Sequence, residues 1–438
     1  MAKFNKNGVI DVLKNIYTFR CLTLRQTYRI YVKYDNITIK EYITVVKNML
    51  QSEFVKMMQY PTKTGSNYAL FITNKGIGIL KQASLIELEV YNPDTGKVKK
   101  GYNTEAALEM LPRLVNHQVH LNQFVIDFMN KIKSTNCYDY KNKPLEYYDE
   151  KFMSKYTCIR PDGMIQLDKV DLFLEMDMLT EQFNQLKQKW INYRNFMRSI
   201  EYRNSKSKII VLFIFPDDES IQDKIQNRIN VVRKSLTDTI VDCFDDKFDI
   251  YIGTKTYLFG YLFNKLIPQI NNTYFMESHV FDDILMKKHG FSGMSTKVCA
   301  DLFNNVNYGR YIRKLNSNNR IPVENGKIQE FIFQESLYRP MSLVYRLSHL
   351  QRNANAFWNK NKRKIDYIVL IEDEETIYND LKVSEIIGLP NIMFTTAKRL
   401  ETMPFHEAVF TIDSIGIVRY FTDSGFRMLE YEKNIFEE

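Results

Sequence analysis

The sequence predicts a multidomain α+β protein. The chain has 438 residues, which is more than a single hydrophobic core usually serves. Apolar residues make up 45% of the chain and aromatic residues 13%, so a sizeable core can be buried. Stretches with helical spacing of apolar residues and short β-prone runs both occur along the chain. We therefore expect several compact domains built from helices and strands.

Positive charge is concentrated near the N-terminus. Residues 1–82 contain 13 lysine and arginine residues and 4 acidic residues, whereas the whole chain has a formal net charge of only +8. A basic segment on a near-neutral body suits binding to a phosphate backbone, because released counterions favour association. A basic domain that is merely soluble is the alternative.

Cysteine usage and hydropathy indicate a cytoplasmic protein. The five cysteines are scattered and form no C-x-x-C pair, which disfavours a disulfide framework and a zinc site. No apolar run approaches the roughly 18 residues that a membrane span needs. The N-terminus also lacks the apolar core of a signal peptide. We expect no membrane partner.

Residues 1–85 are predicted to form a winged helix-turn-helix. The run VIDVLKNIYT predicts a first helix, and Thr23 and Gln26 form a capping box at the start of LTLRQTYRIYV. A second capping box, Thr38 and Glu41, precedes a third helix in TIKEYITVVKNML. Two β-prone runs around PTKTGSN and a short helix then complete the plan.

The third helix of this module is expected to enter the major groove of DNA. Spacing predicts one apolar face made of Ile39, Ile43, Val46, Met49 and Leu50. The residues expected to contact double-stranded DNA are Arg25, Lys40, Thr44, Lys47, Lys56 and Lys63. Winged helices also serve as protein-interaction modules, which is the alternative for this segment.

The stretch RPDGMIQLDKVDLFLEMD concentrates acidic residues in a predicted hairpin. If DKVD forms the turn, Leu167 lies opposite Leu172 and Asp162 lies opposite Asp177. Alternation then brings Asp162, Glu175 and Asp177 to one end of one face, while the other face is apolar. Carboxylates so close together favour a divalent cation, Mg²⁺ or Mn²⁺. A solvated strand end is the alternative.

The helix predicted after this hairpin offers a lysine for phosphodiester chemistry. In TEQFNQLKQKWINYRNFMRSI, Lys187 and Lys189 lie off the apolar face. A lysine that leans over the acids would stabilise charge while water attacks phosphorus. The catalytic set of an active nuclease would therefore be Asp162, Glu175 and Lys189.

Several blocks, taken in order, resemble a known family. The blocks YALFITNKGIGIL, NHQVHLNQFVIDFM, RPDG, FLEMD and KWINY are similar to the replication-relaxation family of Gram-positive plasmids and integrative elements. The resemblance covers about residues 9–240. It implies a DNA-binding protein that acts at an origin or in a relaxosome, together with replication or relaxosome proteins.

The central block is also similar to the PD-(D/E)xK nuclease fold, an α-β-β-β-α-β core. In this resemblance Asp162 matches the first acid of the motif and Glu175 the second. Asp177 stands where the motif has lysine, so Lys189 or Lys187 would have to act in its place. Because many proteins of this fold bind DNA without cutting it, the resemblance favours binding over cleavage.

We expect three domains: a winged helix in 1–85, a PD-(D/E)xK-like α/β domain in 100–260, and a C-terminal α/β domain of unknown role in 261–438. No P-loop, G-x-G-x-x-G, H-x-H or G-x-S-x-G motif occurs. The expected function is DNA binding in replication initiation, DNA relaxation or their control on a plasmid or mobile element. A homodimer of the chain is one expected oligomeric state. The alternatives are a divalent-metal-dependent nuclease or nickase, and a transcriptional regulator whose C-terminal region senses a partner.

Overall fold

The computed structural model describes residues 6–35, 38–62, 65–92, 97–153, 155–240, 243–245, 247–274, 279–293, 309–314, 323–324, 327–328, 330–338, 340–343, 366–372, 392–412, 417–421 and 428–434. The chain divides into two compact units. Unit 1 comprises Met1–Glu181, Arg198–Asp217 and Gly253–Lys255, and unit 2 comprises Gln182–Met197, Asp218–Ile252 and Thr256–Glu438. Helices and strands both contribute to each unit, so the mixed α+β class is confirmed. The division into 1–85, 100–260 and 261–438 stays a prediction.

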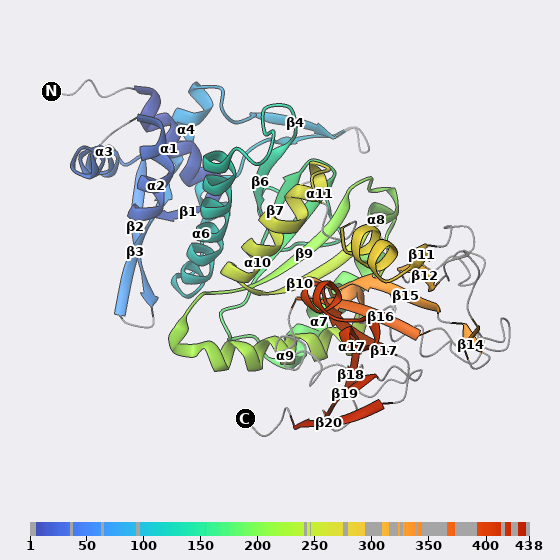
Figure 1. Ribbon diagram of the computed structural model, residues 1–438. Helices are drawn as coiled ribbons and strands as arrows, with labels where there is room; N and C mark the ends of the chain where they lie inside the picture. Colours follow the sequence, from blue (N-terminus) through green and yellow to red (C-terminus); the bar gives the residue numbers. More distant parts are fainter. Residues whose placement is uncertain are drawn as a thin grey trace. The chain divides into compact units, whose positions relative to one another are not determined.

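The N-terminal part of unit 1 combines helices with a small antiparallel sheet (Figure 1). Its elements are α1 (Lys6–Phe19), β1 (Cys21–Thr23), α2 (Leu24–Asp35), α3 (Ile39–Gln51), β2 (Val55–Thr62), β3 (Gly65–Ile72) and α4 (Asn74–Gln82). The strands lie in the order β1-β3-β2. Strands β2 and β3 form a hairpin that runs from Val55↔Ile72 to Thr62↔Gly65.

Two capping boxes determine where α2 and α3 begin. The backbone N–H of Gln26 donates to Thr23 Oγ1 at 3.2 Å, and the N–H of Thr23 donates to Gln26 Oε1 at 3.0 Å. Thr38 and Glu41 make the same reciprocal pair, at 2.9 and 3.3 Å. Each box satisfies backbone donors that the first turn of a helix leaves unpaired. Both predicted boxes are therefore confirmed.

One face of the β2–β3 sheet packs on a long helix, α6 (Pro112–Thr135). The shared apolar cluster consists of Cys21, Tyr60, Ala69, Phe71, Met110 and Val115. Its strand residues alternate along β2 and β3, as expected when one sheet face is buried. The N-terminal sheet and α6 therefore share a single core within unit 1.

The rest of unit 1 is built around a second sheet. Its elements are β4 (Glu89–Asn92), β5 (Lys97–Lys100), α5 (Glu105–Leu108), α6, β6 (Leu145–Asp149), β7 (Gly163–Leu167), β8 (Val170–Met176), α8 (Ile200–Asn204) and β9 (Lys208–Phe215). Strands β6, β7, β8 and β9 are neighbours in this order. The pairs β6–β7 and β7–β8 are antiparallel, and β8–β9 is parallel. All seven residues of β8 are buried, so both of its faces are covered.

The β7–β8 hairpin forms where the sequence predicts it, but its register differs from the expectation. Leu167 pairs with Val170, not with Leu172, so Asp162 lies opposite Glu175, one step beyond the pair Gly163↔Leu174. The turn is shorter than expected because Asp168 adopts a left-handed conformation with φ of 53°. Aspartate tolerates this region better than most residues. A shift of two residues leaves every side chain on its predicted face.

Unit 2 contains helices and an eight-stranded mixed sheet. Its helices are α7 (Phe183–Met197), η1 (Glu219–Ile221), α9 (Gln222–Ile240), α10 (Lys255–Tyr261), η3 (Leu262–Leu266), α11 (Ile267–Ile270), η4 (His279–Lys288), α16 (Ala397–Thr402) and α17 (Phe405–Ala408). The strands of unit 2, of which β10, β13 and β14 lie outside the eight-stranded sheet, are β10 (Phe248–Thr254), β11 (Phe291–Gly293), β12 (Arg310–Lys314), β13 (Val323–Glu324), β14 (Lys327–Ile328), β15 (Glu330–Glu335), β16 (Asp366–Ile371), β17 (Ile392–Thr396), β18 (Phe410–Ile412), β19 (Ile417–Phe421) and β20 (Met428–Asn434). Residues at the boundaries of β10 and α10 belong to unit 1.

The strand order of the large sheet is β11-β12-β15-β16-β17-β18-β19-β20. Its centre, β15-β16-β17, is parallel. Residues such as Phe331, Ile368 and Met393 from these strands pack with helical residues such as Leu285 and Leu400 in one apolar cluster. Among the described helices of both units, none is long and apolar enough to cross a lipid bilayer.

Candidate nucleic-acid interface

Helix α3 presents one apolar face to the core and one polar face to solvent. The buried residues are Tyr42, Val45, Val46 and Met49, so only Val46 and Met49 of the predicted face are buried. Ile43 and Leu50 are partly buried and Ile39 is 58% exposed, because the buried face is rotated toward Tyr42 and Val45. The opposite surface carries Lys40, Thr44 and Lys47, all exposed. Thr44 Oγ1 donates to the carbonyl oxygen of Lys40 at 3.1 Å. In the described part of the chain, neither lysine makes an ion pair, so both ammonium groups face water.

The other predicted DNA contacts are placed differently. Arg25 lies exposed at the start of α2. Lys56 on β2 lies 2.9 Å from Glu105 Oε1 and 2.8 Å from Glu109 Oε1, and hydrogen bonding to Glu109 raises its pKa. Two carboxylates balance its charge, so a phosphate would compete with them for Lys56, and its contact with DNA stays a prediction. Lys63 lies outside the described residues.

The three predicted acids meet at one end of β7 and β8, but two of them are buried. Glu175 is 4% exposed and Asp177 is 1% exposed. Asp162, which is more accessible, accepts a hydrogen bond from the backbone N–H of Met176 at 2.8 Å. Asp177 Oδ1 accepts one from the N–H of Leu179 at 2.7 Å. These two acids therefore hold the backbone at the end of β8.

A histidine from α6 joins this acidic end. His117 Nε2 lies 2.9 Å from the carbonyl oxygen of Met176 and 3.2 Å from Asp162 Oδ2. A protonated Nε2 donates to both oxygens, which ties α6 to the end of β8. Sequence reasoning missed this contact, because Met176 and Asp162 are distant from His117 in the chain.

The acids at this end of the sheet are the predicted ligands of a divalent cation. Within the described ranges, no group of three or more histidine, cysteine or acidic side chains is arranged to hold a metal ion. Magnesium sites often use only one or two carboxylates together with substrate phosphates and water, so the pair Asp162 and Glu175 is the smallest set to consider. Lys189 lies on α7 in unit 2, where Lys187 Nζ is 3.9 Å from Asp238 Oδ2.

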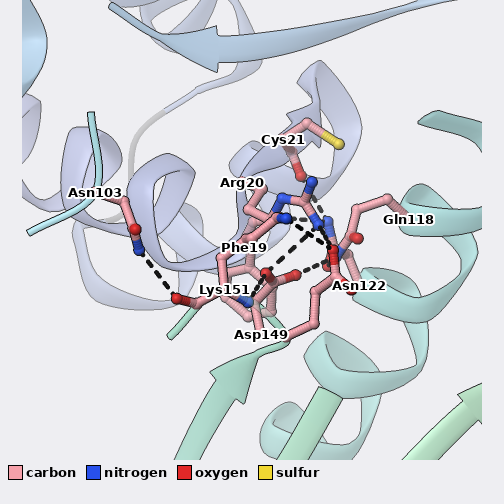
Figure 2. Close-up of polar contacts among 9 residues, drawn as sticks. Phe19, Arg20, Cys21, Asn103, Gln118, Asn122, Asp149 and Lys151 are labelled. Atoms are coloured by element: carbon pink, nitrogen blue, oxygen red, sulfur yellow. Dashed lines mark hydrogen bonds and ion pairs between the residues drawn. The ribbon is translucent and has the colours of Figure 1, made fainter. Parts of the chain in front are cut away.

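A buried polar cluster joins the end of α1 to α6 and β6, as Figure 2 shows. Arg20, which has a φ of 62°, directs Nη1 to within 2.7 Å of Glu150 Oε1 and 3.6 Å of Asp149 Oδ1. Asp149 also accepts hydrogen bonds from Gln118 Nε2 at 2.9 Å and from the N–H of Lys151 at 3.0 Å. Its carboxylate is thus held from three directions.

Asn122 completes this cluster from the next turn of α6. Its Nδ2 donates to the carbonyl oxygens of Phe19 at 3.1 Å and Cys21 at 2.6 Å, on either side of Arg20. Gln118 Nε2 also donates to Asn122 Oδ1 at 3.0 Å. Burial raises the pKa of Asp149 to about 6, although the charge of Arg20 acts in the opposite direction. Sequence reasoning missed this cluster because its members are far apart in the chain.

The fold and these surfaces define an α+β protein with an exposed basic helix and a central sheet whose acids are largely buried. Residues 13–212 match the family model described as replication-relaxation. This match confirms, over most of its length, the family resemblance that the sequence suggested for about residues 9–240. No curated protein and no solved structure matches the chain.

Proposed function

We propose that the chain binds double-stranded DNA and acts in replication initiation, DNA relaxation or their control on a plasmid or mobile element. The match of residues 13–212 to the replication-relaxation model supports the biological role. The observation that carries DNA binding is the exposed face of α3, on which Lys40 and Lys47 flank Thr44. Replication or relaxosome proteins and a second copy of the chain are further partners that this proposal includes.

The N-terminal elements support a winged helix-turn-helix. The chain order α1-β1-α2-α3-β2-β3 and the strand order β1-β3-β2 suit this plan. In that plan α3 is the recognition helix and the β2–β3 hairpin is the wing. The capping box at Thr38 orders the first turn of α3, where a recognition helix contacts base edges and backbone.

The test is DNA binding as a function of salt concentration. A 40-base-pair duplex from the source element should bind the full chain, with an affinity that falls steeply as salt rises. Replacing Lys40 and Lys47 with glutamine should weaken binding and reduce the salt slope by about 2. The matched control replaces Lys224 and Lys234, which are exposed on α9, and should bind like the wild type. Salt-insensitive binding, or equal effects of both pairs, would refute this assignment.

A second candidate function is a divalent-metal-dependent nuclease or nickase. The order α6-β6-β7-β8-α7-β9 suits the α-β-β-β-α-β core of the PD-(D/E)xK fold, and Asp162 lies opposite Glu175 as the two acids of that motif require. Supercoiled plasmid incubated with Mg²⁺ or Mn²⁺ tests it. If Asp162→Asn with Glu175→Gln nicks the plasmid as fast as the wild type, these acids do not catalyse cleavage.

A further inference from the structure

A group of lysines lies at the end of the central sheet where β7 turns into β8. Lys169 occupies the turn and is exposed. Its carbonyl oxygen accepts a hydrogen bond from the backbone N–H of Lys208 at 2.8 Å, where β9 begins. Lys206 precedes this strand and is exposed, and Lys208 is partly exposed. Two segments that are distant in sequence thus bring three lysines together.

The loop before β6 adds a fourth lysine to this end of the sheet. The backbone N–H of Asp168 donates to the carbonyl oxygen of Pro144 at 3.2 Å, which holds the loop against the turn. Tyr138 OH donates to the same carbonyl at 2.8 Å and braces the loop from inside. The exposed Lys141 is part of this loop. We call Lys141, Lys169, Lys206 and Lys208 the turn-end surface.

Acidic residues nearby offset little of this charge. Asp171 is fully buried, and its Oδ2 accepts hydrogen bonds from Lys155 Nζ at 2.6 Å and Tyr156 OH at 2.5 Å. Its charge is therefore matched by Lys155. Asp168 has Lys143 Nζ at 3.7 Å.

Among the described residues, the exposed carboxylates Asp139 and Glu146 lie at this end, and each accepts a hydrogen bond from a neutral side chain. The partly exposed Glu201 accepts hydrogen bonds from the backbone N–H groups of Thr157 and Cys158. They are fewer than the four lysines of the turn-end surface. Within the described residues, none of those lysines makes an ion pair. An excess of positive charge therefore faces water.

The two ends of the sheet differ in charge. The acids Asp162, Glu175 and Asp177 lie at the far end of β8, about 20 Å away for a strand of this length. A polyanion is therefore attracted to the turn end, where the lysines are exposed. Tyr140, which is 38% exposed beside Lys141, adds an aromatic ring that can contact sugar or base.

We propose that the turn-end surface is a second DNA contact, which binds the phosphate backbone of the duplex outside the segment contacted by α3. This inference rests on the proposed DNA-binding function. Lysines supply such contacts as mobile point charges without reading sequence. The turn-end surface therefore adds affinity and length to the bound segment, but no sequence specificity.

The test compares four full-length proteins on one 40-base-pair duplex of arbitrary sequence. The turn-end variant carries Lys169→Gln, Lys206→Gln and Lys208→Gln, and its control carries Lys224→Gln, Lys234→Gln and Lys398→Gln, which removes the same charge from exposed sites in unit 2. The other two proteins are the wild type and the variant of α3 that carries Lys40→Gln and Lys47→Gln. Thermal unfolding verifies that each variant is folded.

The turn-end variant should bind the duplex at least about fivefold more weakly than its control, with a salt slope lower by 2 to 3 at about 0.9 per lost contact. If it binds like the control while the wild type binds in a salt-dependent manner, the inference fails and the proposed function stands. If the wild type does not bind, both fail. A loss seen on a 20-nucleotide single strand but not on the duplex would assign the surface to single-stranded DNA and overturn the proposal as stated.

Discussion

The guanidinium of Arg20 and the carboxylate of Asp149 lie 3.6 Å apart, and both side chains are almost fully buried. Arg20 follows α1 at the N-terminal side of unit 1, whereas Asp149 ends β6 in the central sheet. Because a buried charge without a partner is costly, this pair and its amide neighbours favour the packing of α1 against α6 and β6.

Removing the charge of Arg20 should destabilise the protein strongly. At pH 7.5 the Arg20→Leu variant leaves the ionised Asp149 without its cation, which should lower the free energy of unfolding by about 3 to 5 kcal/mol. Urea denaturation measures this change. The control is Arg29→Leu, whose exposed ion pair with Asp127 should contribute about 1 kcal/mol or less. Equal losses in both variants would contradict a special role for Arg20.

Asp149 should also make stability depend on pH. Its pKa of about 6 in the folded protein lies above its value near 4 in the unfolded chain, so the folded state binds more protons between pH 4 and pH 6. The stabilisation that protonated Asp149 gives the folded protein is fully present below pH 4 and is lost as pH rises through 6. The free energy of unfolding falls by roughly 2 to 3 kcal/mol over this range. Relative to Asp149→Asn, the wild type should lose stability across this window. A difference between the two proteins that does not vary with pH would refute the shift.

The capping box of α3 should support both stability and DNA binding. Replacing Thr38 with alanine removes the acceptor for the N–H of Glu41 and should cost about 1 kcal/mol of stability. Thr38→Ser keeps this acceptor and should be nearly neutral. Thermal unfolding and duplex affinity can be measured on the same samples. If the alanine and serine variants behave alike, the box does not contribute.

Two glycines of α4 provide a matched pair for packing. A Cβ on Gly76 would lie 2.3 Å from the carbonyl oxygen of Phe54 and 2.8 Å from Ile72 Cγ1, whereas a Cβ on Gly78 meets nothing within 4 Å. Gly76→Ala should therefore destabilise the protein by about 1 to 3 kcal/mol. Gly78→Ala should stabilise it by up to about 1 kcal/mol, because alanine favours a helix interior. Chemical denaturation should give opposite signs, and the same sign for both would contradict the packing.

Local signals in the sequence predicted local structure well. The capping boxes at Thr23 and Thr38 and the β7–β8 hairpin are where their short motifs place them. The hairpin register was wrong by two residues, because the pattern of alternation cannot distinguish a two-residue turn from a four-residue turn. The assignment of side chains to the two sheet faces stayed correct, because side chains in a strand alternate with a period of two residues.

Long-range features were beyond the reach of the sequence pattern. The burial of Glu175 and Asp177 depends on elements that cover both faces of β8. The residue pattern within β8 contains no information about these elements. The partners of Lys56 and Arg20 are likewise distant in the chain. The turn-end lysines had a weak signal, Lys206 and Lys208 at the start of an apolar strand, but their proximity to Lys169 could be seen only in the fold.

The apolar cluster shared by the β2–β3 sheet and α6 bears on how the N-terminal region can be studied in isolation. A fragment cut at residue 85 keeps Tyr60 and Phe71 but loses Met110 and Val115, which cover them. Such a fragment would expose these hydrophobic side chains and would leave Arg20 without its acidic partners. It would therefore aggregate or bind nonspecifically. A fragment that contains the basic helix α3 should therefore extend at least through Glu150, so that both acidic partners of Arg20 are present.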